Sequence, residues 1–196
     1  MVRNLTTVGA ALIVLALGVT GASANCAKGK INPVAAINSC TTIIEAADTP
    51  DKTRAAAYYN RGNAQRLLGN HEEAISDFGS AIEITPDDAR LFNNRGRVHK
   101  MLGQNDAALA DAENAVKLEP EKPLSYLVRG SVNSALGNAD AADADWTTGF
   151  KIGGPGLIES FQRYHRAKGH YDGELDGQDS AELRDAMAAC AKEPTC

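Results

Sequence analysis

The sequence of 196 residues is poor in aromatic side chains and lacks the short motifs that mark many enzyme families. Aromatic residues make up 5% of it, which disfavours a β-sandwich, and its many alanines favour packed helices. It has no GxSxG, no phosphate-binding loop and no dinucleotide-binding GxGxxG. His71 opens a segment, HEEA, that begins like a zinc-protease helix, but Ile75 stands where the second histidine is required. We therefore expect neither catalysis nor a bound cofactor or metal.

An excess of positive charge is missing too, and so is a long hydrophobic run. The net charge of −5 argues against nucleic-acid binding. The apolar stretch 8–19 is too short for a comfortable membrane span; Arg3 precedes it and the small residues 22–24 follow it. This pattern predicts a cleaved secretory signal peptide over residues 1–24. We expect a periplasmic or secreted protein without a transmembrane segment. Its net charge would be −6, since Arg3 is lost from 20 basic residues that oppose 25 acidic ones.

Only four cysteines are present, and all of them follow the predicted signal peptide: Cys26, Cys40, Cys190 and Cys196. An even number in an exported chain indicates disulfides, for which three pairings are possible. We favour the pairs Cys26–Cys40 and Cys190–Cys196, because each pair is close in sequence and would fix one end of the chain. A metal site is disfavoured, since there is no CxxC spacing and no histidine near either pair.

The middle of the chain repeats with a period of 34 residues. The repeated positions carry arginine, glycine, alanine and aspartate, as in Arg61, Arg95 and Arg129; Gly62, Gly96 and Gly130; Ala74, Ala108 and Ala142; Asp77, Asp111 and Asp145. Each period holds two stretches with apolar residues at helical spacing, at about 54–68 and 71–84 in the first. Recurring aromatic residues, including Tyr58, Phe78 and Trp146, are expected in the core. A single helical hairpin of this kind cannot cover its own apolar face, so the repeats should stack.

This period and these residues resemble the tetratricopeptide repeat. The resemblance implies an all-α fold, a right-handed superhelix of helical hairpins. The expected organisation is a partial repeat over 25–53 that caps the stack, three repeats over 54–87, 88–121 and 122–155, and a separate tail over 156–196. The Cys26–Cys40 bridge would hold the cap and contribute roughly 3 kcal/mol.

The resemblance also implies a concave groove, lined by the first helix of each repeat, that binds a protein or peptide. The family's inward positions correspond here to three sets: Tyr59, Asn63 and Arg66; Arg90, Asn94, Arg97 and Lys100; Leu124, Leu127, Val128 and Ser131. The groove would be basic at one end and apolar at the other. One subclass grips a C-terminal carboxylate with lysine, asparagine and arginine. Asn63 and Asn94 match its pattern, but Tyr59, Leu124 and Val128 stand where its basic residues are needed. The alternative is that Arg90, Arg97 and Lys100 are merely solvated.

The tail contains the acidic, glycine-rich stretch GHYDGELDG at 169–177. A calcium loop starting at Asp172 would need a carboxylate at its twelfth position, where Leu183 stands. The tail is instead similar to part of a peptidoglycan-binding-like helical domain, through residues that include Gln162, Tyr171 and Asp176. We expect a helix–loop–helix with Tyr171 packed inward. If the tail still binds the cell wall, Gln162, Tyr171, Asp172 and Asp176 are the candidate residues.

Two functional hypotheses follow from the sequence. The first is a non-catalytic exported adaptor that binds a protein or peptide of unknown identity in its groove, without a cofactor. The alternative is a wall-associated module whose tail binds peptidoglycan.

Overall fold

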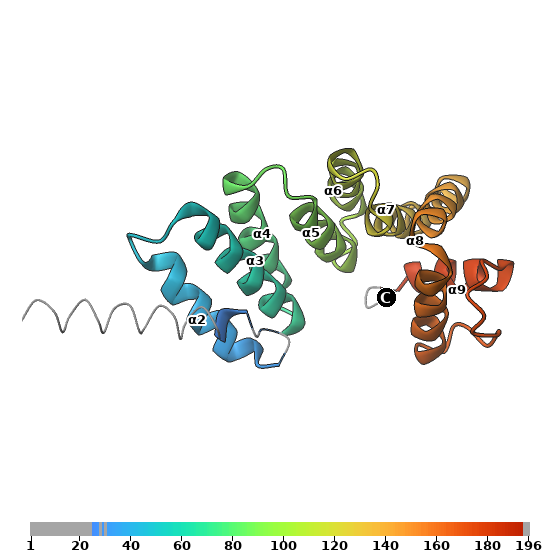
Figure 1. Cartoon of the computed structure of the whole chain (residues 1–196), viewed down its shortest axis with the longest axis horizontal. Helices are drawn as coiled ribbons and strands as arrows, with labels where there is room; N and C mark the ends of the chain where they lie inside the picture. Colours follow the sequence, from blue (N-terminus) through green and yellow to red (C-terminus); the bar gives the residue numbers. More distant parts are fainter. Residues whose placement is uncertain (1–24, 28, 30, 194–196) are drawn as a thin grey trace, which may run out of the picture. The chain divides into compact units, whose positions relative to one another are not determined.

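The computed structural model describes residues 25–27, 29 and 31–193 (Figure 1). These residues belong to two compact units. The first unit ends at Pro86 and the second begins at Asp87. The described residues form eight helices, α2 to α9, and no strand, so the prediction of an all-α fold is confirmed. None of these helices combines the length and the hydrophobicity needed to cross a bilayer. The predicted signal peptide over 1–24 and the predicted bridge to Cys196 lie outside the described residues.

The first unit consists of α2 (Pro33–Glu45), α3 (Asp51–Leu67) and α4 (His71–Ile84). The side chain of Asn32 accepts a hydrogen bond from the backbone of Ala35 and so caps α2, the helix expected from the partial repeat. Between α3 and α4 the chain reverses at Gly69, whose φ of 82° is a conformation that favours glycine. Helix α4 has the bounds that the sequence predicts.

The second unit contains two further hairpins and the tail. Its helices are α5 (Ala89–Met101), α6 (Asn105–Leu118), α7 (Pro123–Ala135), α8 (Ala139–Ala167) and α9 (Ala181–Ala191). The long helix α8 is two helices joined at a kink, where Gly154 has a φ of 71° and Pro155 follows. The kink lies where the 34-residue period stops, so the tail begins as a continuation of the last repeat helix.

An arginine–aspartate ion pair joins the two helices of every hairpin. The nitrogen–oxygen distance is 2.7 Å for Arg61–Asp77, 2.8 Å for Arg95–Asp111 and 2.6 Å for Arg129–Asp145. In each pair the aspartate is buried and the arginine is partly exposed, and its hydrogen bond to the carboxylate raises the arginine pKa. Each guanidinium also lies over an aromatic ring of its own helix, at 5.5 to 5.8 Å from the centroid, on Tyr58, Phe92 and Tyr126. The repeated Arg and Asp positions therefore fix how the two helices of a hairpin pack.

Glycine in the first helix lets an aromatic side chain of the second helix approach the backbone. Phe78 packs on Gly62 in the first hairpin, and Trp146 packs on Gly130 in the third. Both aromatic side chains are buried, as predicted from the repeat. In the middle hairpin Ala112 takes the aromatic position, and a Cβ on Gly96 would instead lie 3.1 Å from Asp111 Cβ and 3.2 Å from the Ala108 oxygen.

Replacing Gly130 with alanine should destabilise the second unit by about 2 kcal/mol, because the packing has no space for a methyl group. A Cβ at this position would lie 2.5 Å from Trp146 Nε1 and 2.6 Å from Cδ1, so the indole ring would have to move. The free energy of unfolding can be measured in urea by the fluorescence of Trp146, the single tryptophan of the chain. Gly156→Ala is the matched control: nothing lies within 4 Å of its added Cβ, so it should not destabilise. Equal stability of Gly130→Ala and the parent would contradict this packing.

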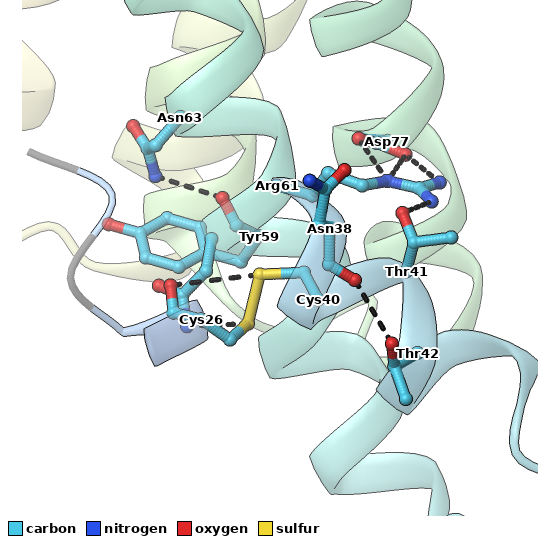
Figure 2. The surroundings of a disulfide bond; sticks show 10 residues. Cys26, Asn38, Cys40, Thr41, Thr42, Tyr59, Arg61, Asn63 and Asp77 are labelled. Atoms are coloured by element: carbon cyan, nitrogen blue, oxygen red, sulfur yellow. Dashed lines mark hydrogen bonds and ion pairs between the residues drawn. A yellow bond between two sulfur atoms is a disulfide. The ribbon is translucent and has the colours of Figure 1, made fainter. Parts of the chain in front are cut away.

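The N-terminal end of the first unit is closed by the predicted Cys26–Cys40 disulfide, which is present (Figure 2). The two Cα atoms are 4.8 Å apart, and both cysteines are buried with Ile43 and Ala57. Beside it, Arg61 donates a 2.9 Å hydrogen bond to Thr41 Oγ1 in addition to its bonds to Asp77 (Figure 2). This arginine therefore links α2 to the first complete hairpin.

The C-terminal end of the second unit is closed by α9, which packs on α7 and α8. Leu183 and Met187 of α9 join Trp146 and Phe150 of α8 in one buried cluster. Arg184 fixes this contact: it donates to the backbone oxygen of Asp143 at 3.0 Å and to Thr147 Oγ1 at 3.1 Å, and it lies over the rings of Trp146 and Phe150. The tail is thus part of the core of the second unit.

Candidate partner-binding surface

The candidate surface lies on the first helix of each hairpin, α3, α5 or α7. It is the side of that helix that faces away from the second helix of the same hairpin, α4, α6 or α8. Residues 34 positions apart occupy equivalent places on α3, α5 and α7. In the second unit, α5 and α7 pack against each other, and the buried Asn93 of α5 donates a 3.0 Å hydrogen bond to Ser125 Oγ of α7. The predicted groove positions of these two helices therefore form one continuous face, which we call the α5–α7 face. Its residues are Arg90, Asn94, Arg97 and Lys100 of α5 and Leu124, Val128 and Ser131 of α7.

In the first unit the predicted groove residues serve the packing of α3 itself. Tyr59 is half-buried with its ring 6.2 Å from that of Phe78, and Asn63 Nδ2 donates a 3.0 Å hydrogen bond to the Tyr59 carbonyl. Figure 2 shows Tyr59 and Asn63 on the opposite side of α3 from Arg61. Arg66 is half-buried near the end of this helix.

Two described residues before α2, Cys26 and Gly29, also lie against α3. A Cβ at the buried Gly29 would be 3.5 Å from that of Ala64 and 3.7 Å from the backbone oxygen of Asn60. Cys26, pinned by its disulfide, packs one turn earlier, beside Ala57. The start of the described chain therefore occupies part of α3 that the sequence alone leaves open to a partner.

In the second unit the four predicted residues of α5 fall into two pairs. Arg90 is exposed, and its guanidinium binds the carboxylate of Asp88, whose pKa is lowered by this interaction. Asn94 donates a 2.7 Å hydrogen bond to the Arg90 carbonyl. Arg97 is exposed, and Lys100, one turn further, is half-buried. Burial, with a smaller contribution from Arg97, lowers the pKa of Lys100.

On α7 the structure places the predicted apolar residues differently. Leu127 is buried, with 4% of its surface exposed, in the cluster that contains Trp146 and Phe150, so it packs in the core and does not line the surface. By the 34-residue period, Leu127 is equivalent to Asn93 on α5, which is also buried. Leu124 instead is 50% exposed, and Val128 lies one turn further at 7%. Leu124 therefore carries the apolar character of the α5–α7 face.

In the tail, three of the four candidate wall-binding residues hold the loop together. Gln162 is fully buried; its amide donates to Asp176 Oδ1 at 2.8 Å and to the Gln178 carbonyl at 3.1 Å, and its oxygen accepts from Gly177 N. Tyr171 is buried, as predicted, and donates to the Glu174 carbonyl. Asp172 is exposed. The glycine-rich stretch is thus a turn organised around one glutamine side chain.

Comparison with known proteins identifies the repeats. Tetratricopeptide repeat models match residues 55–88 and 93–146. The chain contains tetratricopeptide repeats. The structure is similar to a crystal structure of MamA, with a TM-score of 0.60 at 20% identity over 80% of this chain and 86% of that one. It is also similar to a tetratricopeptide repeat protein from Parabacteroides merdae ATCC 43184, with a TM-score of 0.61 at 22% identity over 89% of this chain and 76% of that one. No curated protein matches the chain.

At these identities the two solved structures establish a shared fold and no shared partner. Tetratricopeptide repeats are protein-interaction scaffolds, so the repeats assign this chain to that general role. The residues that could contact a partner must therefore be identified from the surface of this chain. Sequence reasoning missed Asn93 and Arg184 because neither belongs to a repeated motif; only the contacts between helices show their roles.

Acidification should destabilise the second unit through His165. This side chain is 4% exposed between the rings of Phe161 and Tyr164, and burial, with a smaller contribution from His170, lowers its pKa to about 4. In the unfolded chain its pKa would be about 6.5, so between pH 6.5 and 4 the unfolded state binds more protons. The stabilisation is complete above pH 6.5 and is lost as the pH falls. We expect the free energy of unfolding to drop by about 2 kcal/mol between pH 7 and pH 5.

The measurement is urea unfolding followed by Trp146 fluorescence at several pH values. His165→Leu should remove most of this pH dependence, because the variant has no group to protonate at this position. His71→Gln, in the first unit, should leave it unchanged. A pH dependence that persists in His165→Leu would show that another group causes it.

Proposed function

We propose that this chain is an exported, non-catalytic adaptor that binds a protein or peptide partner on the exposed face of its repeats. The observation that carries the proposal is the α5–α7 face. Arg97 and Leu124 are exposed at its repeat-defined positions and contribute nothing to the core of the second unit. Arginine is enriched at protein interfaces, and the buried centre of an interface is more apolar than the rest of the surface.

Two features support an exported location. The sequence of residues 1–24 has the pattern of a signal peptide. The disulfide between Cys26 and Cys40 is of the kind that persists in oxidising compartments such as the periplasm and is rare in the cytosol. Both features concern the chain itself and do not depend on its relatives.

The alternative is a wall-associated module that binds peptidoglycan through its tail. The exposed carboxylates of Asp172 and Asp176 favour it, because carboxylates can accept hydrogen bonds from sugar hydroxyl groups. The interior positions of Gln162 and Tyr171 leave those two side chains no free surface for a glycan. The adaptor is therefore the better supported proposal.

Chemical cross-linking in intact bacteria distinguishes the two proposals. The tagged chain would be cross-linked, purified under denaturing conditions, and analysed with and without muramidase digestion. Discrete protein adducts that survive digestion are expected for an adaptor. Material that co-sediments with sacculi and is released by muramidase would support the wall-bound alternative, and it should then depend on Asp172. Recovery of the chain without any adduct would contradict both proposals.

A further inference from the structure

We propose that the α5–α7 face binds an acidic peptide segment that also carries a large apolar side chain. Its carboxylates would lie at Arg97 and Lys100, and its apolar side chain would lie on Leu124. This inference rests on the proposed function and specifies the chemistry of the partner. The three residues come from two adjacent helices of one unit, so no placement of the other unit enters the argument.

The charges on α5 point to an acidic ligand. Most arginines that the structure describes already meet a carboxylate of this chain, including the interhelix pairs, Arg90 with Asp88 and Arg184 with Asp179. Among residues 25–27, 29 and 31–193, Arg97 and Lys100 have no carboxylate within 4.0 Å. These two cations lie one helical turn apart on the same side of α5. They form a local positive site on a chain whose net charge is −5.

The surroundings of Lys100 make an added carboxylate favourable. Its ammonium is partly removed from water and lies near a second cation, and both effects disfavour the charged form and lower its pKa. A carboxylate placed between Arg97 and Lys100 would reverse the second effect and compensate for the first. A partly buried charge pair of this kind contributes more to binding than one at a fully solvated position.

The apolar part of the ligand follows from Leu124. By the 34-residue period Leu124 on α7 is equivalent to Arg90 on α5, and the two helices are packed together. On α7 the positions equivalent to Arg97 and Lys100 are Ser131 and Ser134, so the two cations belong to α5 alone and the exposed apolar side chain is Leu124. A ligand that crosses both helices meets two cations and then a leucine with half of its surface exposed. A nucleic acid would need a longer basic track than two side chains on an acidic chain provide, so a peptide fits better.

The test is selection from a random library of twelve-residue peptides displayed on phage, with the purified, oxidised full chain as the target. We expect enriched peptides to combine at least one aspartate or glutamate with a large apolar residue. A synthetic copy of an enriched peptide would then be titrated by fluorescence anisotropy. The double variant Arg97→Gln/Lys100→Gln should weaken its binding by about tenfold or more, and Leu124→Ser should weaken it severalfold.

The matched control is Lys117→Gln/Lys151→Gln, which removes the same charge from exposed positions on α6 and α8. It should change the affinity less than about twofold, because distant exposed charges are screened by salt. Three outcomes would overturn the proposal: enriched peptides without acidic residues, an equal loss in the control variant, or binding independent of Leu124. If cross-linking in cells still yields protein adducts while any of these holds, the adaptor function stands and only the assigned peptide chemistry is wrong.

Discussion

Replacing Asp145 with alanine should destabilise the second unit by about 3 kcal/mol, the largest effect we expect from one substitution. The buried carboxylate accepts from Arg129 at 2.9 and 2.6 Å and from Asn133 Nδ2 at 3.2 Å. Its removal leaves a partly buried guanidinium without its hydrogen-bonded counter-ion. Loss of one partner of a buried pair costs about 3 to 5 kcal/mol, and we take the lower end because 26% of the Arg129 side chain meets solvent.

The control for this prediction is an exposed ion pair in the same unit. Arg163 and Glu159 pair on the surface of α8 with 65% and 38% of their side chains exposed, so Glu159→Ala should cost less than about 1 kcal/mol. Replacing Arg129 and Asp145 together with leucine should recover much of the loss, since no charge is left unpaired. Urea unfolding followed by circular dichroism measures all three variants. A cost below about 1 kcal/mol for Asp145→Ala would show that solvent, and not the aspartate, satisfies the arginine.

Removing the disulfide with Cys26→Ala/Cys40→Ala should destabilise the first unit by about 3 kcal/mol. The bridge closes a loop across a sequence separation of 14 residues, and a loop of that size is worth about 3 kcal/mol through the entropy of the unfolded chain. Cys26 and the nearby Gly29 both lie against α3. Faster amide hydrogen exchange in α2 and α3 is therefore the expected result, with little change in the second unit.

A change elsewhere on α2 provides the comparison. Thr42 is exposed and donates only to the Asn38 carbonyl, so Thr42→Ala should alter the exchange of α2 by no more than about 0.5 kcal/mol (Figure 2). If the double cysteine variant exchanges as slowly as the parent, then helix packing alone holds the start of the chain. That result would remove the disulfide from the account of the first unit.

The fold could be predicted in detail because its signals are periodic. The spacing of apolar residues gave the helices, and glycines such as Gly69 marked the turns between them. The repetition of the arginines and aspartates is visible in the sequence, but their pairing is not. The partners are 16 residues apart on different helices, and only the packing of the hairpin brings them together. The sequence signal for this pairing is that arginine and aspartate recur with the same period of 34 residues.

The candidate surface was harder to predict, because the period does not show which side of a helix a neighbour covers. Leu127 and Leu124 are three residues apart on α7, yet one is in the core and the other is exposed. Leu127 shares its buried cluster with Trp146 and Phe150 of α8 and with Leu183 and Met187 of the tail. Sequence comparison between repeats cannot reveal this, since only the last repeat meets the tail.

The most direct test of the adaptor proposal is photo-cross-linking from one chosen position in living cells. A photoreactive amino acid would replace Leu124 on the α5–α7 face, and in a matched variant it would replace Ala110, an exposed residue of α6. The account predicts a discrete protein adduct from position 124, none from position 110, and loss of the adduct when Arg97 and Lys100 are changed to glutamine. Equal adducts from both positions, or none from position 124, would contradict it.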